Sequence, residues 1–130
     1  MFTKEFVVCV DSVCVRDGKM LLLKCSVESF KGYWHVVGGH VEENVSLKEA
    51  LKREFKEETG LDVTVGGIIA GRIEKSFDRI KIIVAFEVFS SEGEIHLNSE
   101  NEAYGWFDKV PRDCVYNYAK YLLNRGSISK

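Results

Sequence analysis

The chain has 130 residues, of which 45% are hydrophobic and 29% are charged, a composition typical of one globular domain spanning residues 1–130. Its formal net charge of −2 provides no broad basic surface, so a long nucleic acid is a poor candidate for its partner. No apolar run is long enough to span a membrane and the first residues do not fit a signal peptide, so we expect a cytoplasmic protein without membrane contacts.

Two antiparallel strands are predicted at the start of the chain. Residues 6–15 and 19–25 are rich in β-branched, aromatic and aliphatic side chains. The pair Asp17-Gly18 between them is typical of a two-residue hairpin turn. The chain therefore opens with a β-hairpin.

A short strand is predicted over residues 33–37, after a polar interval. It runs directly into Gly38 and Gly39. Because glycine has no Cβ atom, two adjacent glycines permit a close approach of the backbone to another group.

A helix of about four turns is predicted from Ser46 to Thr59. Ser46 and Glu49, three residues apart, form a capping-box pattern at its start. Gly60 is the residue type preferred just after the end of a helix.

The remaining elements complete an α/β pattern. Strands are predicted over residues 61–73, 80–89 and 104–107, and an amphipathic helix over residues 112–123, with Pro111 at its start. Strands around an early helix and a closing helix predict an α/β sandwich about one mixed β-sheet.

The cysteines are predicted to be reduced, buried thiols. They form no Cys-x-x-Cys pair and lie among apolar, strand-like residues. A structural zinc site would need cysteines and histidines close together, whereas here both types are scattered, at Cys9, Cys14, Cys25, Cys114, His35, His40 and His96.

The helix from Ser46 to Thr59 carries an apolar stripe that becomes acidic in its second half. At about 100° per residue, Glu54, Glu57 and Glu58 continue the line begun by Leu47, Ala50 and Leu51. We therefore expect these carboxylates to point into the rim of the protein body. They could share a hard divalent cation, or they could form a solvated face with ion pairs along the helix, and spacing alone leaves both interpretations open.

Residues 39–61 resemble the signature of the Nudix (MutT-like) hydrolases. Every signature position but one matches in the pattern Gly39-x5-Val45-x7-Arg53-Glu54-Phe55-x-Glu57-Glu58-x-Gly60-Leu61. The exception is Val45, which stands where the signature has glutamate, preceded by Asn44 where glycine is common. Val37 also replaces the usual proline before Gly38.

The resemblance implies a Nudix-type fold, an α/β/α sandwich around a mixed β-sheet. It also implies an enzyme that cleaves a phosphoanhydride bond of a nucleoside diphosphate linked to another group, with Mg²⁺ or Mn²⁺ as cofactor. It places the metal on Glu54, Glu57 and Glu58, and one of these acids would also act as base toward the attacking water. Arg53 would orient Glu54, and Gly38 would offer its backbone carbonyl to the metal.

A further carboxylate is often supplied in this family by a loop ahead of a late tryptophan. Glu100 and Glu102 both precede Trp106, and Glu100 is our prediction for the additional metal ligand. An exposed loop acid without function is the alternative.

The substrate is the least determined part of the interpretation. The compact length is similar to that of the nucleoside triphosphate pyrophosphohydrolases, with ADP-ribose or a nucleotide sugar as the alternative substrate. Trp34 could stack on the base and Arg72 could meet a phosphate. Because Val45 departs from the signature, a catalytically weakened module that binds nucleotide or protein is also open, and so is a homodimer.

Overall fold

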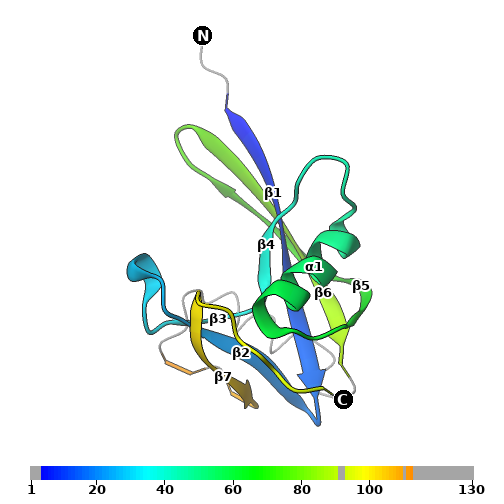
Figure 1. Cartoon of the computed structure of the whole chain (residues 1–130). Helices are drawn as coiled ribbons and strands as arrows, with labels where there is room; N and C mark the ends of the chain where they lie inside the picture. Colours follow the sequence, from blue (N-terminus) through cyan, green and yellow to red (C-terminus); the bar gives the residue numbers. More distant parts are fainter. Residues whose placement is uncertain (1–3, 91–92, 110, 113–130) are drawn as a thin grey trace.

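One mixed β-sheet and one α-helix make up most of the part of the chain described by the computed structural model, residues 4–90, 93–109 and 111–112 (Figure 1). The elements in chain order are β1 (Glu5–Arg16), β2 (Lys19–Cys25), the 3₁₀ helix η1 (Glu28–Phe30), β3 (Trp34–His35), β4 (Gly38–His40), α1 (Leu47–Thr59), β5 (Thr64–Lys75), β6 (Arg79–Phe89) and β7 (Asn101–Phe107). The predicted closing helix lies almost wholly outside the described residues.

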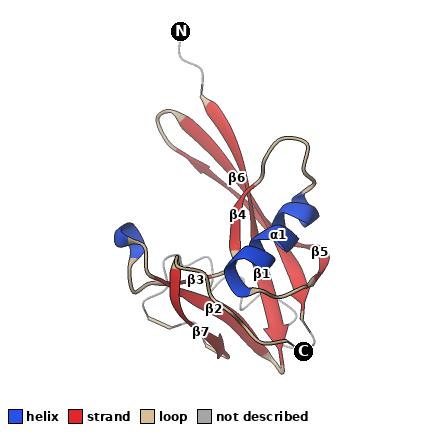
Figure 2. Ribbon diagram, in the orientation of Figure 1, coloured by secondary structure: helices blue, strands red, loops and turns tan. Residues whose placement is uncertain are grey.

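The seven strands form a single sheet with the order β3-β2-β1-β6-β5, in which β4 also pairs with β1 and β7 with β2. The pairing of β1 with β6 is parallel and the other pairings are antiparallel, so the sheet is mixed as predicted. Figure 2 shows α1 lying against this sheet, with η1 apart from it on the side of β3. No helix within the described residues is long and apolar enough to cross a membrane.

The opening hairpin is confirmed. Its turn has left-handed backbone angles at both central residues, with φ of 53° at Asp17 and 74° at Gly18. Such angles match the twist of the flanking strands. Arg16 and Lys19 pair directly across the turn.

The single strand predicted over residues 33–37 is wrong in detail. The structure has a strand of only two residues there, β3 on β2, and the next strand, β4, begins after this range at Gly38 and pairs with β1, because the chain changes partner strands between them. Val37 at the crossing is buried, and its carbonyl oxygen accepts a hydrogen bond from Ser12 Oγ at 2.7 Å. Backbone polar groups at the crossing are thereby partly satisfied without a continuous ladder.

The predicted caps of α1 are confirmed. Ser46 Oγ accepts a hydrogen bond from the backbone nitrogen of Glu49 at 3.1 Å. Gly60 ends the helix with a φ of 76°, and its N–H donates to the carbonyl oxygen of Lys56 at 3.0 Å. Both ends of the acidic helix are therefore fixed.

Apolar side chains alternate between the two faces of the sheet, as the two-residue period of a strand requires. On one face, Ala50, Leu51 and Phe55 of α1 are fully buried against strand residues that include Val10 and Leu21. The opposite face holds a second cluster of Cys9, Val13, Met20, Leu22, Ala70, Ile83 and Ala85. The burial predicted for the thiols of Cys9 and Cys14 is confirmed, whereas Cys25 is only half-buried and Cys114 lies outside the described residues.

Candidate functional site

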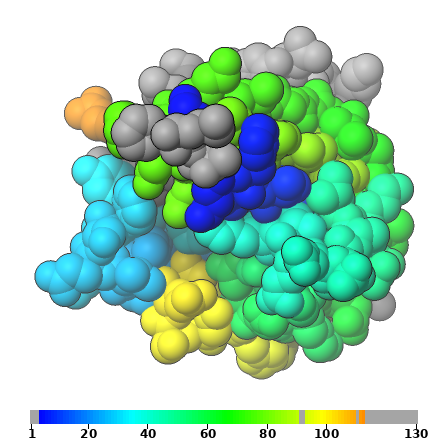
Figure 3. Space-filling view, turned by 90° about the horizontal axis from the view of Figure 1, so that it is seen from above, coloured from blue at the N-terminus to red at the C-terminus, as the bar shows by residue number. Residues whose placement is uncertain are grey.

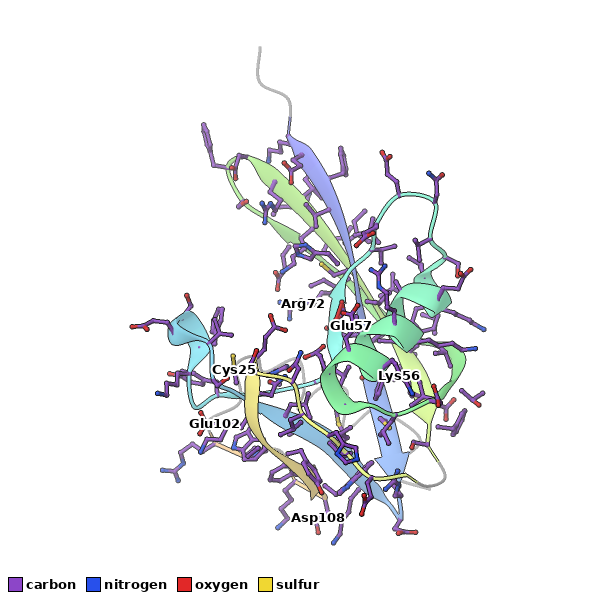
Figure 4. The ribbon with its side chains drawn as sticks, in the orientation of Figure 1. Cys25, Lys56, Glu57, Arg72, Glu102 and Asp108 are labelled. Carbon is purple, nitrogen blue, oxygen red and sulfur yellow. The ribbon has the colours of Figure 1, made fainter. Side chains whose placement is uncertain are left out.

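The three glutamates in the acidic half of α1 are buried to different extents. Glu58 is buried with 6% of its surface exposed, and Glu54 is half-buried. The side chain of Glu57 is 58% exposed, so it lies farther out than the helical geometry suggested (Figure 4). Two carboxylates therefore enter the rim of the body and a third stands beside them.

Glu54 and Glu58 are held in contact by a hydrogen bond between their side chains. Burial raises the pKa of Glu58 to about 8, and the neighbouring charge of Glu54 adds to this effect. Burial also raises the pKa of Glu54, while its hydrogen bond with Glu58 opposes the rise. The two acids thus share a proton when no cation is bound.

Glu100 acts on the same pair from the loop before β7. Its negative charge raises the pKa of both Glu54 and Glu58. The loop is fixed by Asn98, whose Oδ1 accepts from the backbone nitrogen of Glu100 at 3.2 Å. Glu102 is exposed on β7, and Figure 4 shows it well apart from Glu57. Of the two predicted loop acids, Glu100 is the one that the fold brings to the helix.

The two glycines of β4 have close neighbours on opposite faces of the strand. A Cβ atom at Gly39 would stand 2.5 Å from Glu54 Oε1. A Cβ atom at Gly38 would collide with the carbonyl oxygen of Val10 and the carboxylate of Asp11. A side chain at Gly38 would meet backbone, whereas one at Gly39 would displace the carboxylate of Glu54, so the backbone of β4 lies directly against that carboxylate.

Arg53 links α1 to the loop that precedes it. Its Nη2 lies 3.2 Å from Glu42 Oε1, and its Nε lies 3.7 Å from Glu57 Oε1. The Nε atom is buried without a hydrogen-bond partner among the described residues. The predicted relation to Glu54 takes the form of a charge effect, since Arg53 lowers the pKa of that carboxyl.

Val45 and Asn44, which depart from the signature at the start of α1, each fit the structure around them. Val45 is half-buried and packs against the apolar cluster beneath the helix. Asn44 has a φ of 65°, a left-handed conformation that asparagine tolerates better than most residues. The loop thus retains a backbone that glycine would adopt readily, with an apolar contact in place of a carboxylate.

Asn101 is a site residue that the sequence did not reveal. Its Nδ2 donates to Glu58 Oε1 at 3.2 Å, and its Oδ1 lies 2.8 Å from His35 Nε2. The hydrogen bond from Asn101 opposes the rise in the pKa of Glu58 because it favours the ionised form. Its place directly after Glu100 was the only signal in the sequence.

Trp34 and Arg72 are placed on the face of the sheet opposite α1. Trp34 packs edge-on against Phe107, with ring centroids 4.9 Å apart, beside the apolar cluster of that face. Arg72 is paired with Glu74, and its positive charge acts on Asp11, which adjoins Gly38. The fold therefore does not group these two residues with the carboxylates of α1.

A recess lies beside the site in the space-filling view. Figure 3 shows it between the segment around η1 in light blue, the loop before β7 in yellow, and the residues from β4 to α1 in cyan to green. The loop that borders it carries Glu100. A ligand entering this recess would approach the acidic side of the site.

The donor set fits a hard divalent cation. Among the residues that the structure describes, no three His, Cys, Asp or Glu side chains form a ready-made metal cluster. Yet the negative charge of Glu100 raises the pKa of both Glu54 and Glu58, so the three acids lie near one another, and all their donor atoms are oxygens. Bringing a cation among them would replace the shared proton and relieve the repulsion.

Comparisons with known sequences identify similar proteins over most of the chain. The model of the NUDIX domain family matches residues 5–113. A CTP pyrophosphohydrolase of Escherichia coli is 35% identical over 75% of this chain and 72% of that protein. An ADP-ribose pyrophosphatase of Methanocaldococcus jannaschii is 34% identical over 78% of this chain, which spans only 61% of that protein. The nucleoside triphosphatase NudI of E. coli is 30% identical over 78% of this chain and 79% of that protein.

Solved structures have the same fold. The solution structure of the E. coli ORF135 protein superposes with a TM-score of 0.72 and 31% identity, covering 80% of this chain and 74% of that one. The crystal structure of the MutT protein of Methanosarcina mazei superposes with a TM-score of 0.80 and 25% identity, covering 96% of this chain and 95% of that one.

Proposed function

The chain belongs to the Nudix family of hydrolases, and from this premise we propose that it is a metal-dependent nucleoside triphosphate pyrophosphohydrolase. One observation carries the proposal. Glu54 and Glu58 of α1 lie beside a surface recess, close enough to Glu100 for its negative charge to act on both. Such a group of acids suits a cation that itself binds phosphate oxygens.

The choice of a triphosphate is supported by the relatives of comparable length. The two whose names specify a nucleoside triphosphate substrate are covered over 72% and 79% of their length. The ADP-ribose pyrophosphatase is covered over only 61% of its length. ADP-ribose or another nucleotide sugar is therefore the second candidate substrate class.

The metal would be held by Glu54, Glu57, Glu58 and Glu100, with the backbone carbonyl of Gly38 as a further ligand. Bound Mg²⁺ or Mn²⁺ would neutralise charge on the phosphate oxygens and make water more acidic. Glu57 would leave its ion pair with Arg53 at 3.7 Å to reach this position. Asn101 would continue to orient Glu58 through its amide.

The reaction is the attack of water on one phosphorus of the anhydride. Either Glu54 or Glu57 takes the proton from the attacking water, and the bond between that phosphorus and the bridging oxygen breaks. From a triphosphate the products are a nucleoside monophosphate and pyrophosphate. Arg53 would keep its contact with Glu42 at 3.2 Å at the edge of this site after Glu57 has moved to the metal.

A binding module with weakened catalysis is the competing function, because Val45 replaces the signature glutamate. Both functions predict nucleotide binding, but only the enzyme releases products. The purified chain should be incubated with Mg²⁺ and a panel of nucleoside triphosphates, ADP-ribose and a nucleotide sugar, and the products separated by ion-exchange chromatography.

We expect monophosphate and pyrophosphate from at least one triphosphate. Two monophosphate products from ADP-ribose, without triphosphate turnover, would select the second substrate class. Binding of nucleotides without release of any product would overturn hydrolysis and favour the binding module.

A further inference from the structure

Three side chains from separate parts of the fold form a continuous hydrogen-bond chain that ends at the acidic site. His35 of β3 lies with Nε2 2.8 Å from Asn101 Oδ1, and Asn101 Nδ2 donates to Glu58 Oε1 at 3.2 Å. Asn101 and Glu58 are each only 6% exposed. Because water has little access, each amide or carboxylate atom depends on these partners for its orientation.

The orientation of the Asn101 amide follows from its other neighbours. A backbone N–H, that of Glu100, donates to Asn98 Oδ1, so this atom is an acceptor. Asn101 lies 3.3 Å from the same oxygen and must present its nitrogen there. The amide oxygen of Asn101 is therefore the atom that faces His35.

The state of the imidazole follows in turn. Because Asn101 offers an acceptor, His35 Nε2 carries a proton and donates it. His35 Nδ1 lies 2.8 Å from the carbonyl oxygen of Val36, a second acceptor. The doubly protonated ring satisfies both contacts, and the Nε2–H tautomer satisfies the contact with Asn101 alone.

We propose that His35 is a positioning residue that fixes Glu58 through Asn101 in the orientation required to bind the divalent cation. The inference rests on the proposed function, since it specifies how that same site is held. His35 would not touch the substrate or the metal. Together with Asn98 Oδ1, it would keep the Asn101 amide from rotating, and a rotated amide would turn its oxygen toward the carboxylate of Glu58.

The test measures the binding of Mn²⁺ to the full chain without nucleotide. Electron paramagnetic resonance monitors the concentration of the free ion. His35→Leu removes the donor to Asn101, and we expect it to raise the Kd for Mn²⁺ by about tenfold or more. His35→Gln retains an N–H donor and should stay within about threefold of the wild type.

His96→Leu is the matched control, because the His96 side chain is exposed and lies 3.8 Å from the exposed carboxylate of Glu94. We expect this variant to bind Mn²⁺ as the wild type does. The proposal would be overturned if His35→Leu bound Mn²⁺ with a Kd within about twofold of the wild type. It would also be overturned if His35→Gln bound Mn²⁺ as weakly as His35→Leu does.

A second measurement does not depend on the folding of any variant. Titration of the wild-type chain with Mg²⁺ should shift the ring nitrogen resonances of His35 more than those of His96, because a cation on Glu58 polarises the chain of hydrogen bonds. Unchanged His35 resonances at saturating Mg²⁺ would overturn it. Since neither measurement requires turnover, failure of the hydrogen-bond chain and failure of hydrolysis are distinguishable.

Discussion

Glu54 and Glu58 are hydrogen-bonded to each other across one turn of α1, so two acids of the signature share a proton when no cation is bound. This arrangement is unfavourable for an isolated helix, in which acids four residues apart repel each other. The pair lies beside β4 and the loop that carries Glu100, where a bound cation would relieve the repulsion between the acids.

The first prediction concerns the pH dependence of stability without metal. Burial raises the pKa of Glu58 in the folded chain from its ordinary value of 4.5 to about 8, so between these values the folded form holds a proton that the unfolded form has lost. Stability should therefore fall as pH rises from about 5 to 8, by at most about 1.4 kcal/mol per pH unit for one proton.

Urea unfolding in the presence of EDTA at several pH values measures this slope. Glu58→Gln should flatten it, because the amide does not titrate. A wild-type slope that is unchanged by Glu58→Gln would show that other groups control the pH dependence.

The second prediction concerns Gly39. In Gly39→Ala the new Cβ would stand 2.5 Å from Glu54 Oε1, and the flexible carboxylate should move away while the fold persists. We expect at least about a tenfold loss of hydrolysis with a small change in thermal stability. Gly67→Ala is the control, because a Cβ there meets nothing within 4 Å, and equal activity of both variants would contradict the role of this contact.

The third prediction concerns Glu42, which holds Arg53 at 3.2 Å at the entrance to α1, where Val45 provides no carboxylate. Glu42→Gln should lower the rate several-fold by freeing Arg53, while the exposed ion pair changes stability by less than about 1 kcal/mol. Initial rates and urea midpoints check both parts. Glu43→Gln alters the neighbouring exposed acid and should leave the rate unchanged. Equal rates for Glu42→Gln and Glu43→Gln would refute the prediction.

The fourth prediction concerns the left-handed backbone at Asn44, where φ is 65°. Asn44→Gly should keep or slightly raise stability, whereas Asn44→Ala should lower it by about 1 kcal/mol, because alanine is strained in this conformation. Chemical denaturation of the pair gives the difference directly. Equal stabilities would indicate that the loop relaxes when asparagine is replaced.

Local signals in the sequence were sufficient for most of the fold. The Asp17-Gly18 turn and the caps Ser46 and Gly60 act through neighbouring backbone, so their consequences are readable without knowing the rest of the chain. The early end of the strand predicted over residues 33–37 depends on the change of partner from β2 to β1, which the local pattern does not contain.

The site was predictable where helical spacing or the family signature determined it. Helical geometry directed Glu54 and Glu58 inward but did not reveal that Arg53 draws Glu57 outward. Asn101 and His35 are 66 residues apart in the chain, and their contact exists only once β7 has paired with β2. Trp34 has a role in packing on the opposite face, which its aromatic character alone could not distinguish from stacking on a base.

The most direct test of metal-dependent hydrolysis compares Glu57→Gln with the wild type, using CTP and Mg²⁺ as the first assay and the other triphosphates as further ones. The wild type should release monophosphate and pyrophosphate, EDTA should stop the release, and Glu57→Gln should lower the rate by about 100-fold or more. Glu28→Gln, an exposed acid on η1, should leave the rate unchanged. Triphosphate hydrolysis at the wild-type rate by Glu57→Gln, or in excess EDTA, would contradict the assignment of this acidic helix as the metal site.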